Sequence, residues 1–380
     1  MIYLDNAATT FPKPISVCLA VEDCIKNYCA NPGRGSHDLS LKCELKIMEC
    51  RERIAKLLNV KDPMRIIFTS NTTEGLNLAI KGVLNPGDHV ITTMIEHNSV
   101  LRPLEAMRSL GVEVTMIPVD KEGYISIANI TNSVKKNTKA VIINHGSNVL
   151  GTVQDINAIG SLCKTLGVLF IVDGAQTVGY LDINVEEMSI DILAFPGHKS
   201  LLGLQGIGGI YISPNIELKP LKEGGTGSLS NSMIQPTFLP DKFESGTVNT
   251  PGIVGLSEGV KFILNTGLNN IRKHEGELIK QLTEELRKLP YIKLYGELDS
   301  YIKAPVLSFN IDGFDSSEVG ELLNEKNFCV RCGYHCCPMI HKIIGTSNTG
   351  TVRVSPGYFN SNVDIEEFII AIENIYKLNF

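Results

Sequence analysis

The sequence predicts an α/β protein in which a large domain with a mostly parallel sheet is followed by a smaller α+β domain. Three observations predict this fold class. Short apolar runs alternate with longer segments of helical period up to about residue 250. Charged helical segments and isolated strands follow from about residue 255, and a length of 380 residues suits two domains.

The strands of the large domain are predicted at 65–69, 89–93, 113–117, 140–144, 169–173 and 190–195. Helices are predicted between them, among others over 76–83 and 156–166. This alternation is typical of parallel sheets with helices on both faces, whose ligands bind outside the carboxyl ends of the strands. We therefore expect the functional side chains directly after strands.

The smaller domain is predicted from a long charged helical region at roughly 255–289 and from strands at 306–311 and 351–354. The expected bounds are 15–255 for the large domain, and 1–14 together with 256–380 for the small one.

The composition, 43% apolar and 20% charged, is that of an ordinary globular protein. Lys and Arg number 35 against 41 Asp and Glu, and they are scattered, so we expect no nucleic-acid binding. No basic segment precedes an apolar one at the start, and apolar runs are interrupted by polar residues. We therefore expect no membrane segment, a cytoplasmic location and reduced thiols at the ten cysteines.

The first chemical signal is Thr-Ser-Asn-Thr-Thr-Glu-Gly at 69–75, which ends a strand and opens a helix. Hydroxyl groups and free backbone N–H groups at a helix N-terminus bind phosphate. The same residue types are also ordinary helix caps, so this segment alone leaves both readings open.

Two ionisable residues follow the next predicted strands. Asp173 ends an apolar strand, where it can hold a protonated ring nitrogen or, alternatively, cap a helix. Lys199 lies on a turn between apolar flanks, where burial lowers the pKa of a lysine and suits it to Schiff-base chemistry; a surface lysine is the alternative. A phosphate site, a carboxylate and a lysine at successive strand ends predict a pyridoxal 5'-phosphate (PLP) site.

Seven short motifs, spread over nearly the whole chain, carry a resemblance to a known family. They are Tyr-Leu-Asp-Asn-Ala-Ala-Thr-Thr at 3–10, Glu-His at 96–97, Ser-Asn-Val-Leu-Gly-Thr at 147–152, Asp-Gly-Ala-Gln at 173–176, Gly-His-Lys at 197–199, Glu-Ser-Gly-Thr at 244–247 and Arg-Cys-Gly-Tyr-His-Cys at 331–336. The chain resembles the class V aminotransferases of PLP fold type I, and among them the cysteine desulfurase and selenocysteine lyase branch. The resemblance implies a seven-stranded sheet in the large domain.

The resemblance also implies the cofactor contacts. Lys199 would form the Schiff base with PLP, Asp173 would pair with the pyridine nitrogen, and Gln176 with the phenolic oxygen. His97 would stack on the ring and take part in catalysis. The implied phosphate ligands are Thr72, Thr73, His198 and, across a homodimer interface, Thr247. Many relatives carry a Ser at the position of Pro196, and proline offers neither a hydroxyl nor an N–H to the phosphate.

The substrate contacts follow from the same resemblance. Asn148 and Arg353 match the residues that hold the substrate carboxylate, a task suited to the fork of donors in arginine. Arg331 and His335 share a motif with Cys336 and are expected to bind substrate. Two further residues match positions near the active-site entrance, Asn6 and Arg34.

Cys336 determines which reaction we expect. It follows His335 and precedes Pro338, which can begin a short helix ending near residue 344. A helix N-terminus and an imidazole both favour a reactive thiol. In the family, a cysteine at this place accepts sulfur from L-cysteine as a persulfide, and Arg-x-Gly-x-His-Cys resembles the second group of desulfurases. We therefore expect a PLP-dependent desulfurase that releases L-alanine.

Two alternatives stay open. A selenocysteine lyase, or another PLP-dependent β-eliminase or transaminase, would use the same scaffold, with L-selenocysteine as a possible substrate. A non-catalytic sulfur carrier is the third class, against which Lys199, Asp173 and Arg353 argue. The resemblance also implies a homodimer, a sulfur-acceptor protein and a role in iron–sulfur cluster biogenesis.

The other cysteines raise the question of a metal. A C-x2-C-x3-C-C-x3-H pattern offers ligands for zinc or an iron–sulfur cluster at Cys329, Cys332, Cys336, Cys337 and His341. The spacing matches no standard zinc pattern and a metal would occupy Cys336, so we expect none. Cys332 and Cys337 are instead expected near the persulfide as relay or redox partners, although one of them could simply be packed. A second group is expected as helical core residues: Cys18, Cys24, Cys29, Cys43 and Cys50.

Overall fold

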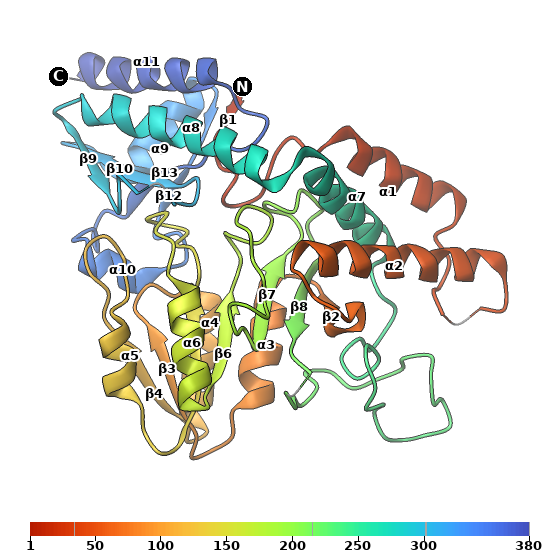
Figure 1. Cartoon of the computed structure of the whole chain (residues 1–380). Helices are drawn as coiled ribbons and strands as arrows, with labels where there is room; N and C mark the ends of the chain where they lie inside the picture. The colour runs from red at the N-terminus through yellow and green to blue at the C-terminus, as the bar shows by residue number, and fades with distance from the viewer. Residues whose placement is uncertain (34, 215, 301, 380) are drawn as a thin grey trace.

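Seven strands form the large sheet, in the spatial order β2-β8-β7-β6-β5-β3-β4 (Figure 1). The computed structural model describes residues 1–33, 35–214, 216–300 and 302–379. The strands of this sheet are β2 (Ile66–Thr69), β3 (His89–Thr93), β4 (Glu113–Ile117), β5 (Thr138–Asn144), β6 (Leu169–Asp173), β7 (Ile192–Pro196) and β8 (Gly208–Ile212). Only β8 runs against its neighbours, pairing antiparallel with β7 and β2. The expected mostly parallel sheet is confirmed.

β8 is the strand of the large sheet that the sequence does not predict. It begins at Gly208-Gly209, in a glycine-rich run that shows no clear strand pattern. A Cβ at residue 209 would lie 2.6 Å from the ring of Phe195 on the adjacent strand, so only glycine fits there. The glycines that hide this strand from sequence reasoning are needed for its packing.

The helices lie on both faces of the large sheet and around the smaller one (Figure 1). They are α1 (Ile15–Asn27), α2 (Asp38–Leu57), α3 (Thr72–Val83), α4 (Asn98–Ser109), α5 (Ile127–Ser133), α6 (Ile156–Leu166), α7 (Thr250–Thr266), α8 (Leu268–Arg287), α9 (Ser316–Glu325), α10 (Pro338–Ile343) and α11 (Asn362–Asn379). α3 begins four residues before the predicted start at 76, because Asn71 caps it.

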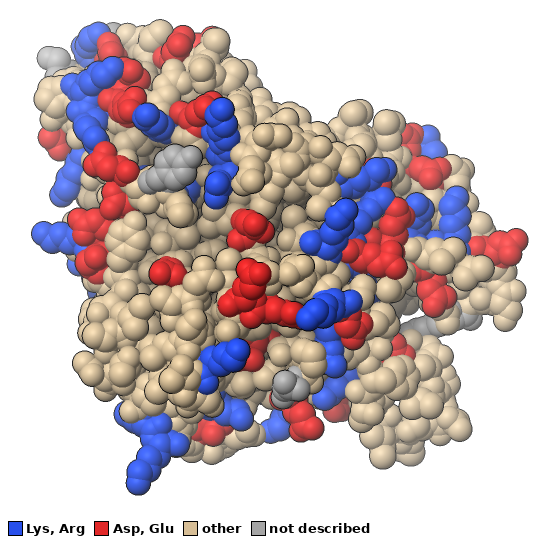
Figure 2. All heavy atoms as spheres, in the orientation of Figure 1, with Lys and Arg blue, Asp and Glu red and all other residues tan. Residues whose placement is uncertain are grey.

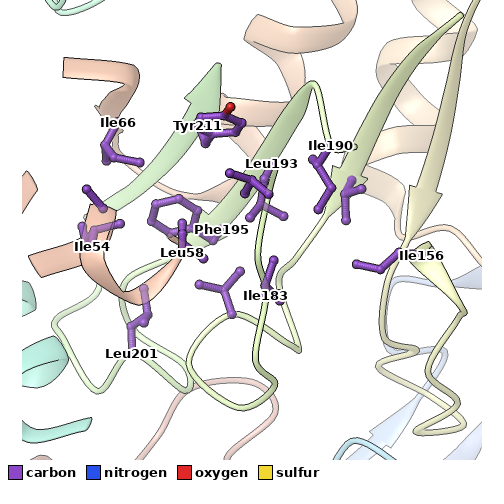
Figure 3. Close-up of a cluster of buried hydrophobic side chains, with 14 of the residues drawn as sticks. Ile54, Leu58, Ile66, Ile156, Ile183, Ile190, Leu193, Phe195, Leu201 and Tyr211 are labelled. Atoms are coloured by element: carbon purple, nitrogen blue, oxygen red, sulfur yellow. The ribbon is translucent and has the colours of Figure 1, made fainter. Parts of the chain in front are cut away.

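Alternate residues of the strands supply two separate cores, one on each face of the large sheet. In β6, Phe170 and Val172 join one core, and Ile171 joins the other. The first core also contains Ile54 of α2, and Figure 3 shows it packed near Phe195 of β7. Residues of α3 and α4 complete the second core. Burial on both faces explains why the strands appear in the sequence as continuous apolar runs.

The smaller domain is built on a four-stranded antiparallel sheet in the order β12-β13-β10-β9 and on a parallel pair β1-β11. These strands are β1 (Ile2–Tyr3), β9 (Ile292–Tyr295), β10 (Leu307–Ile311), β11 (Phe328–Cys329), β12 (Arg331–Gly333) and β13 (Thr351–Val354). Of these, β1, β9, β11 and β12 are likewise not predicted by the sequence. Leu278 of α8 and Phe368 of α11 pack into its core, whereas Val260 of α7 joins the core of the large sheet. The domain boundary at residue 255 stays a prediction.

Among the described helices, none combines the length and the apolar character needed to span a bilayer. Figure 2 shows basic side chains lying among acidic ones over the face that it draws.

Two of the N-terminal cysteines are not core residues, which corrects the prediction. Cys18 of α1 and Cys29, just beyond that helix, are exposed. Cys24, Cys43 and Cys50 are buried as expected. The helical period places Cys18 on the outer face of α1, one residue after the buried Val17.

Candidate active site

A cavity of about 210 Å³ lies where the strands of the large sheet end. Its lining contains the predicted residues Thr72, Thr73, His97, Asn148, Asp173, Gln176, His198, Lys199, Arg331, His335 and Arg353. Larger cavities occur elsewhere, one of about 740 Å³ beside the segment 223–236 and one of about 620 Å³ along α8. We place the site in the smaller cavity because the predicted ionisable groups gather there.

The N-terminus of α3 forms one wall. Asn71 is the helix cap, and its Oδ1 accepts the N–H of Glu74 at 2.9 Å. Thr72 and Thr73 lie in the first turn, where backbone N–H groups have no partner within the helix. The capping role therefore falls on Asn71, and the two threonines line the cavity.

Asp173 ends β6 and is only 2% exposed. Its Oδ1 accepts the N–H of Ala175 at 2.9 Å. Burial raises the pKa of this carboxyl, and the nearby charge of Lys199 opposes the rise. A turn rather than a helix follows Asp173, so the helix-cap alternative is wrong. A buried carboxylate of this kind is stabilised by a cationic N–H donor.

Lys199 lies on the bend that follows β7, and it lines the cavity rather than the outer surface. Burial lowers the pKa of Lys199 to about 8, with a further lowering from Arg353 and an opposing effect of Asp173. The peptide before it is firmly held, because the carbonyl of His198 accepts the Thr9 hydroxyl at 3.1 Å and Lys13 Nζ at 2.7 Å.

The cavity also contains neutral imidazoles. Burial, and then the charge of Lys199, lowers the pKa of His97 and of His198 to about 4. Nδ1 of His97 accepts the N–H of Ser99 at 3.0 Å, and Ser99 Oγ lies 2.7 Å from Thr73 Oγ1. Nδ1 of His198 is buried and has no hydrogen-bond partner among the described residues.

Arg353 is 1% exposed, and its guanidinium is held on two sides. Nη2 lies 2.6 Å from Asp5 Oδ1, and Nη1 donates to the carbonyl of Asn148 at 3.1 Å. Nε is buried without a partner among the described residues, as is Oδ1 of Asn148. These two predicted carboxylate ligands therefore lie together and keep unused polar atoms.

Cys336 is exposed, and the side chain beside its thiol differs from the predicted one. The imidazole of His335 is turned away from it, with Nε2 lying 3.0 Å from Thr351 Oγ1. The neighbour of the thiol is instead Arg331, whose Nη2 donates to Cys336 Sγ at 3.6 Å. α10 has only six residues and begins at Pro338, two residues beyond Cys336. The helix therefore begins at Pro338 as expected, whereas the expected imidazole is replaced by a guanidinium from β12.

The backbone at Cys336 is strained. His335 and Cys336 have φ values of 51° and 59°, in the left-handed region that non-glycine residues rarely adopt. The carbonyl of Cys336 accepts the N–H of Asn98 at 2.8 Å, and the carbonyl of His335 accepts Asn148 Nδ2 at 2.7 Å. These contacts hold the segment in a conformation of the kind that clusters at functional sites.

The remaining members of the cysteine-rich pattern point to different partners. Cys337 is buried, and its thiol donates to the carbonyls of Ile95 and Glu96 at 3.0 and 3.1 Å. His341 Nδ1 lies 2.7 Å from Thr346 Oγ1. Within the residues that the structure describes, no group of three or more His, Cys, Asp or Glu side chains is placed to hold a metal ion. Of the two expected relay thiols, Cys337 is fully buried and Cys332 packs, partly buried, against the core of the smaller domain.

Several predicted residues lie outside this cavity. Thr247 lines a separate cavity of about 170 Å³ beside Ser70. Pro196 ends β7 and pairs with Gly208 of β8. Asn6 is 8% exposed, and its amide donates to the carbonyl of Ser355 at 3.0 Å. Arg34 lies outside the described residues.

Sequence reasoning missed four residues that the structure adds to the site. Ser99 and Asn144 line the cavity, and Asp5 pairs with Arg353. Glu96 is fully buried, and its Oε1 accepts the Thr93 hydroxyl at 2.7 Å and the N–H of Asn144 at 2.9 Å. Asp5 lies in the motif at 3–10 and Glu96 in the motif at 96–97, but neither motif by itself indicates a role for the carboxyl.

The cavity fits PLP on the chemistry of its donors. A phosphate needs N–H and O–H donors, which the first turn of α3 and the unpartnered Nδ1 of His198 provide. A protonated ring nitrogen needs a buried carboxylate, which Asp173 provides. An aldehyde needs an amine of lowered pKa, which is the state of Lys199.

Comparison with known proteins gives one consistent result. Residues 2–368 match the family model described as aminotransferase class-V. A probable cysteine desulfurase of Methanothermobacter thermautotrophicus is 36% identical, covering 98% of this chain and 94% of that protein. A cysteine desulfurase of Wigglesworthia glossinidia brevipalpis is 32% identical, covering 99% of this chain and 93% of that protein. The apo structure of the cysteine desulfurase from Thermococcus onnurineus NA1 has a TM-score of 0.93 and 34% sequence identity. This match covers 99% of this chain and 94% of that one. The chain therefore belongs to the class V aminotransferase family.

Proposed function

We propose that this protein is a PLP-dependent cysteine desulfurase, which converts L-cysteine to L-alanine and keeps the sulfur on Cys336 as a persulfide. One observation carries the proposal. Arg331 lines the cavity and donates to Cys336 Sγ, so the exposed thiol adjoins the cavity that contains Lys199 and Asp173. The names of the similar proteins agree with this activity.

The residues that would hold the cofactor are those whose donors fit its groups. We assign the phosphate to Thr72, Thr73 and His198, the ring nitrogen to Asp173, the phenolic oxygen to Gln176, the ring face to His97 and the aldehyde to Lys199. When bound, PLP supplies an electron sink that acidifies the Cα proton of an amino acid and weakens the bond to its β-substituent.

Lys199 is the proton carrier of the proposed reaction. Its pKa of about 8 leaves part of the amine unprotonated near neutral pH. Nζ can therefore accept the Cα proton of the substrate and deliver that proton to a different atom. Arg353 and Asn148 would hold the substrate carboxylate and so orient the substrate in the cavity.

Cys336 would take the sulfur. Its Sγ attacks the substrate sulfur, so an S–S bond forms while the substrate's C–S bond breaks. The bonding pair stays with the carbon, which gains a proton and leaves as alanine. Arg331 next to Cys336 offers a cationic donor to the sulfur anion in this step.

The test is to incubate the protein with L-cysteine and to measure alanine, sulfide and protein-bound persulfide together. We expect alanine and a persulfide on Cys336 in the wild type. Cys336→Ala should lose cysteine turnover and keep the visible absorbance of the cofactor, whereas Cys18→Ala, which removes an exposed thiol on α1, should behave as the wild type. Normal turnover by Cys336→Ala would contradict the proposal. Turnover of L-selenocysteine alone would favour the lyase.

The proposal includes a homodimer in which Thr247 of each subunit reaches the phosphate in the other. Exposed apolar side chains support such an interface: Ile15, Leu19, Leu41, Leu45, Met233 and Ile234. Mixing Lys199→Ala with Thr247→Ala tests it, because a mixed dimer contains one intact site. Half of the sites in the mixed dimers should then regain wild-type affinity for PLP, and no recovery would contradict the shared site.

The persulfide implies an acceptor for its sulfur. We propose a cytoplasmic acceptor protein and a use in iron–sulfur cluster biogenesis, which rest on the family resemblance. Transfer of labelled sulfur from the persulfide to an apo iron–sulfur protein in the presence of cell extract would test this part.

A further inference from the structure

The ion pair between Asp5 and Arg353 joins two residues that are 348 positions apart in the sequence. The distance from Arg353 Nη2 to Asp5 Oδ1 is 2.6 Å, and the side chains are 1% and 19% exposed. A buried guanidinium needs a nearby opposite charge, and Asp5 supplies it.

The backbone fixes this contact. Asp5 and Ser355 form a parallel β-bridge, in which the N–H of Ser355 donates to the carbonyl of Leu4 at 2.7 Å. The N–H of Asn6 donates back to the carbonyl of Ser355 at 3.1 Å. Residues two apart on a strand share a face, so the bridge to Ser355 brings Asp5 beside Arg353.

The position of Asp5 relative to the cavity distinguishes two roles. A carboxylate inside the cavity would occupy the place of the substrate carboxylate and compete with it. Arg353 belongs to the lining of the cavity, whereas Asp5 does not. Asp5 therefore contacts the guanidinium away from the lining, which is the arrangement of a supporting residue.

The hydrogen bonds of Arg353 are consistent with support. The guanidinium has five N–H donors, and the contacts to Asp5 and Asn148 engage one nitrogen each. Nε stays buried without a partner among the described residues. A guanidinium held at Nη1 and Nη2 cannot turn freely, and it keeps N–H donors for a ligand carboxylate.

We propose that Asp5 is the positioning residue of Arg353, which sets the affinity of the site for ligands that carry an α-carboxylate. The inference rests on the proposed function in one respect, that Arg353 holds the substrate carboxylate. Asp5 itself makes no contact with the substrate and acts through the orientation of the guanidinium.

The test compares Asp5→Asn, Asp5→Glu and the control Asp299→Asn in the PLP-loaded enzyme. Asp299 forms an Asp–Arg pair with Arg287 at 2.8 Å on the surface, so its loss removes the same type of contact far from Arg353. Two ligands are titrated by the change in cofactor absorbance. L-Alanine carries an α-carboxylate, and cysteamine does not.

We expect Asp5→Asn to weaken L-alanine binding on the order of 10-fold, the effect of losing one hydrogen bond between charged groups, and to leave cysteamine binding unchanged. KM for L-cysteine should rise by a similar factor, with a smaller change in kcat. Asp5→Glu, which keeps the charge, should recover part of the affinity, and Asp299→Asn should match the wild type.

Three results would overturn the inference. Tighter L-alanine binding by Asp5→Asn would show that Asp5 competes with the ligand carboxylate for Arg353. Unchanged binding would show that the Asp5–Arg353 pair does not affect ligand affinity. Equal weakening of L-alanine and cysteamine binding would show that Asp5 has only a structural role. Thermal unfolding of each variant shows that it is folded. If the wild type binds L-alanine but does not desulfurate L-cysteine, the proposed function is contradicted. The titrations with L-alanine and cysteamine still test the role of Asp5 in that case.

Discussion

Arg331 Nη2 lies 3.6 Å from Cys336 Sγ, and Arg331 is also one of the residues that line the cavity containing Lys199. This contact links an exposed thiol to the candidate site. It also replaces the imidazole of His335, which the chain order suggested as the partner of Cys336 but which lies beside Thr351 instead.

The contact predicts that Arg331 controls the reactivity of Cys336. Since a cationic donor stabilises the sulfur anion, which is the reactive form, Arg331→Ala should slow alkylation of Cys336 by iodoacetamide at pH 7 by roughly 3- to 10-fold. Arg331→Lys, which keeps a charge but loses the planar fork, should be intermediate. Peptide mass spectrometry follows the rate. Cys18 in the same sample is the internal reference, and an equal slowing at both thiols would count against a local effect.

The lowered pKa of Lys199 predicts the pH at which its amine becomes reactive. In the apo protein, reductive methylation of Lys199 should rise with pH along a curve whose midpoint lies near pH 8, since burial disfavours the charged form. Arg353→Met should move the midpoint up, because Arg353 lowers this pKa, and Asp173→Asn should move it down, because Asp173 raises it. Exposed Lys136 is the reference in the same digests. Shifts in the same direction for both variants would rule out the electrostatic explanation.

Glu96 predicts a pH dependence of stability. Burial raises its pKa to about 8, so the folded protein keeps the proton that the unfolded chain loses above its ordinary pKa of 4.5. The folded state then binds more protons, and this carboxyl lowers the free energy of unfolding as pH rises from 5 to 8. Glu96→Gln keeps an oxygen acceptor for Thr93 and does not titrate.

The stability advantage of Glu96→Gln over the wild type should therefore grow between pH 5 and 8, by roughly 1 kcal/mol per pH unit. Urea unfolding at both pH values measures it. Glu366→Gln, on the exposed face of α11, should show no such trend, and an advantage of Glu96→Gln that does not change with pH would disprove the assignment.

Phe195 predicts how much the core beneath the site contributes to stability. It is fully buried on β7, close to Leu58 and Leu193 in Figure 3. Phe195→Ala should lower the free energy of unfolding by about 3 to 5 kcal/mol, because it removes packing and leaves a cavity. The 43% exposed Phe359 is the matched control, and its replacement by Ala should cost less than about 1 kcal/mol. Denaturant unfolding of both variants measures the two free energies of unfolding. Equal losses of stability in the two variants would contradict the prediction.

The parallel strands, with Asp173 and Lys199 after two of them, could be predicted because they depend on local order in the chain, whereas most other lining residues were expected from the family resemblance. An apolar run followed by Asp173 or by Lys199 is visible in the sequence, and the carboxyl ends of parallel strands meet at one edge of the sheet. β8 was missed because its glycines are selected by the close approach of Phe195 and carry no periodic signal.

The sequence by itself determined the fold class and most strand ends, since period and chain order are sufficient for these, and its resemblance to a known family implied most of the residues that gather there. Only the tertiary structure decided which groups touch. The pairing of Asp5 with Arg353, the replacement of His335 by Arg331 at Cys336, and the packing of Cys337 depend on strand register and side-chain direction across distant segments. Such contacts arise from the packing of the whole chain, so no local pattern of residues encodes them.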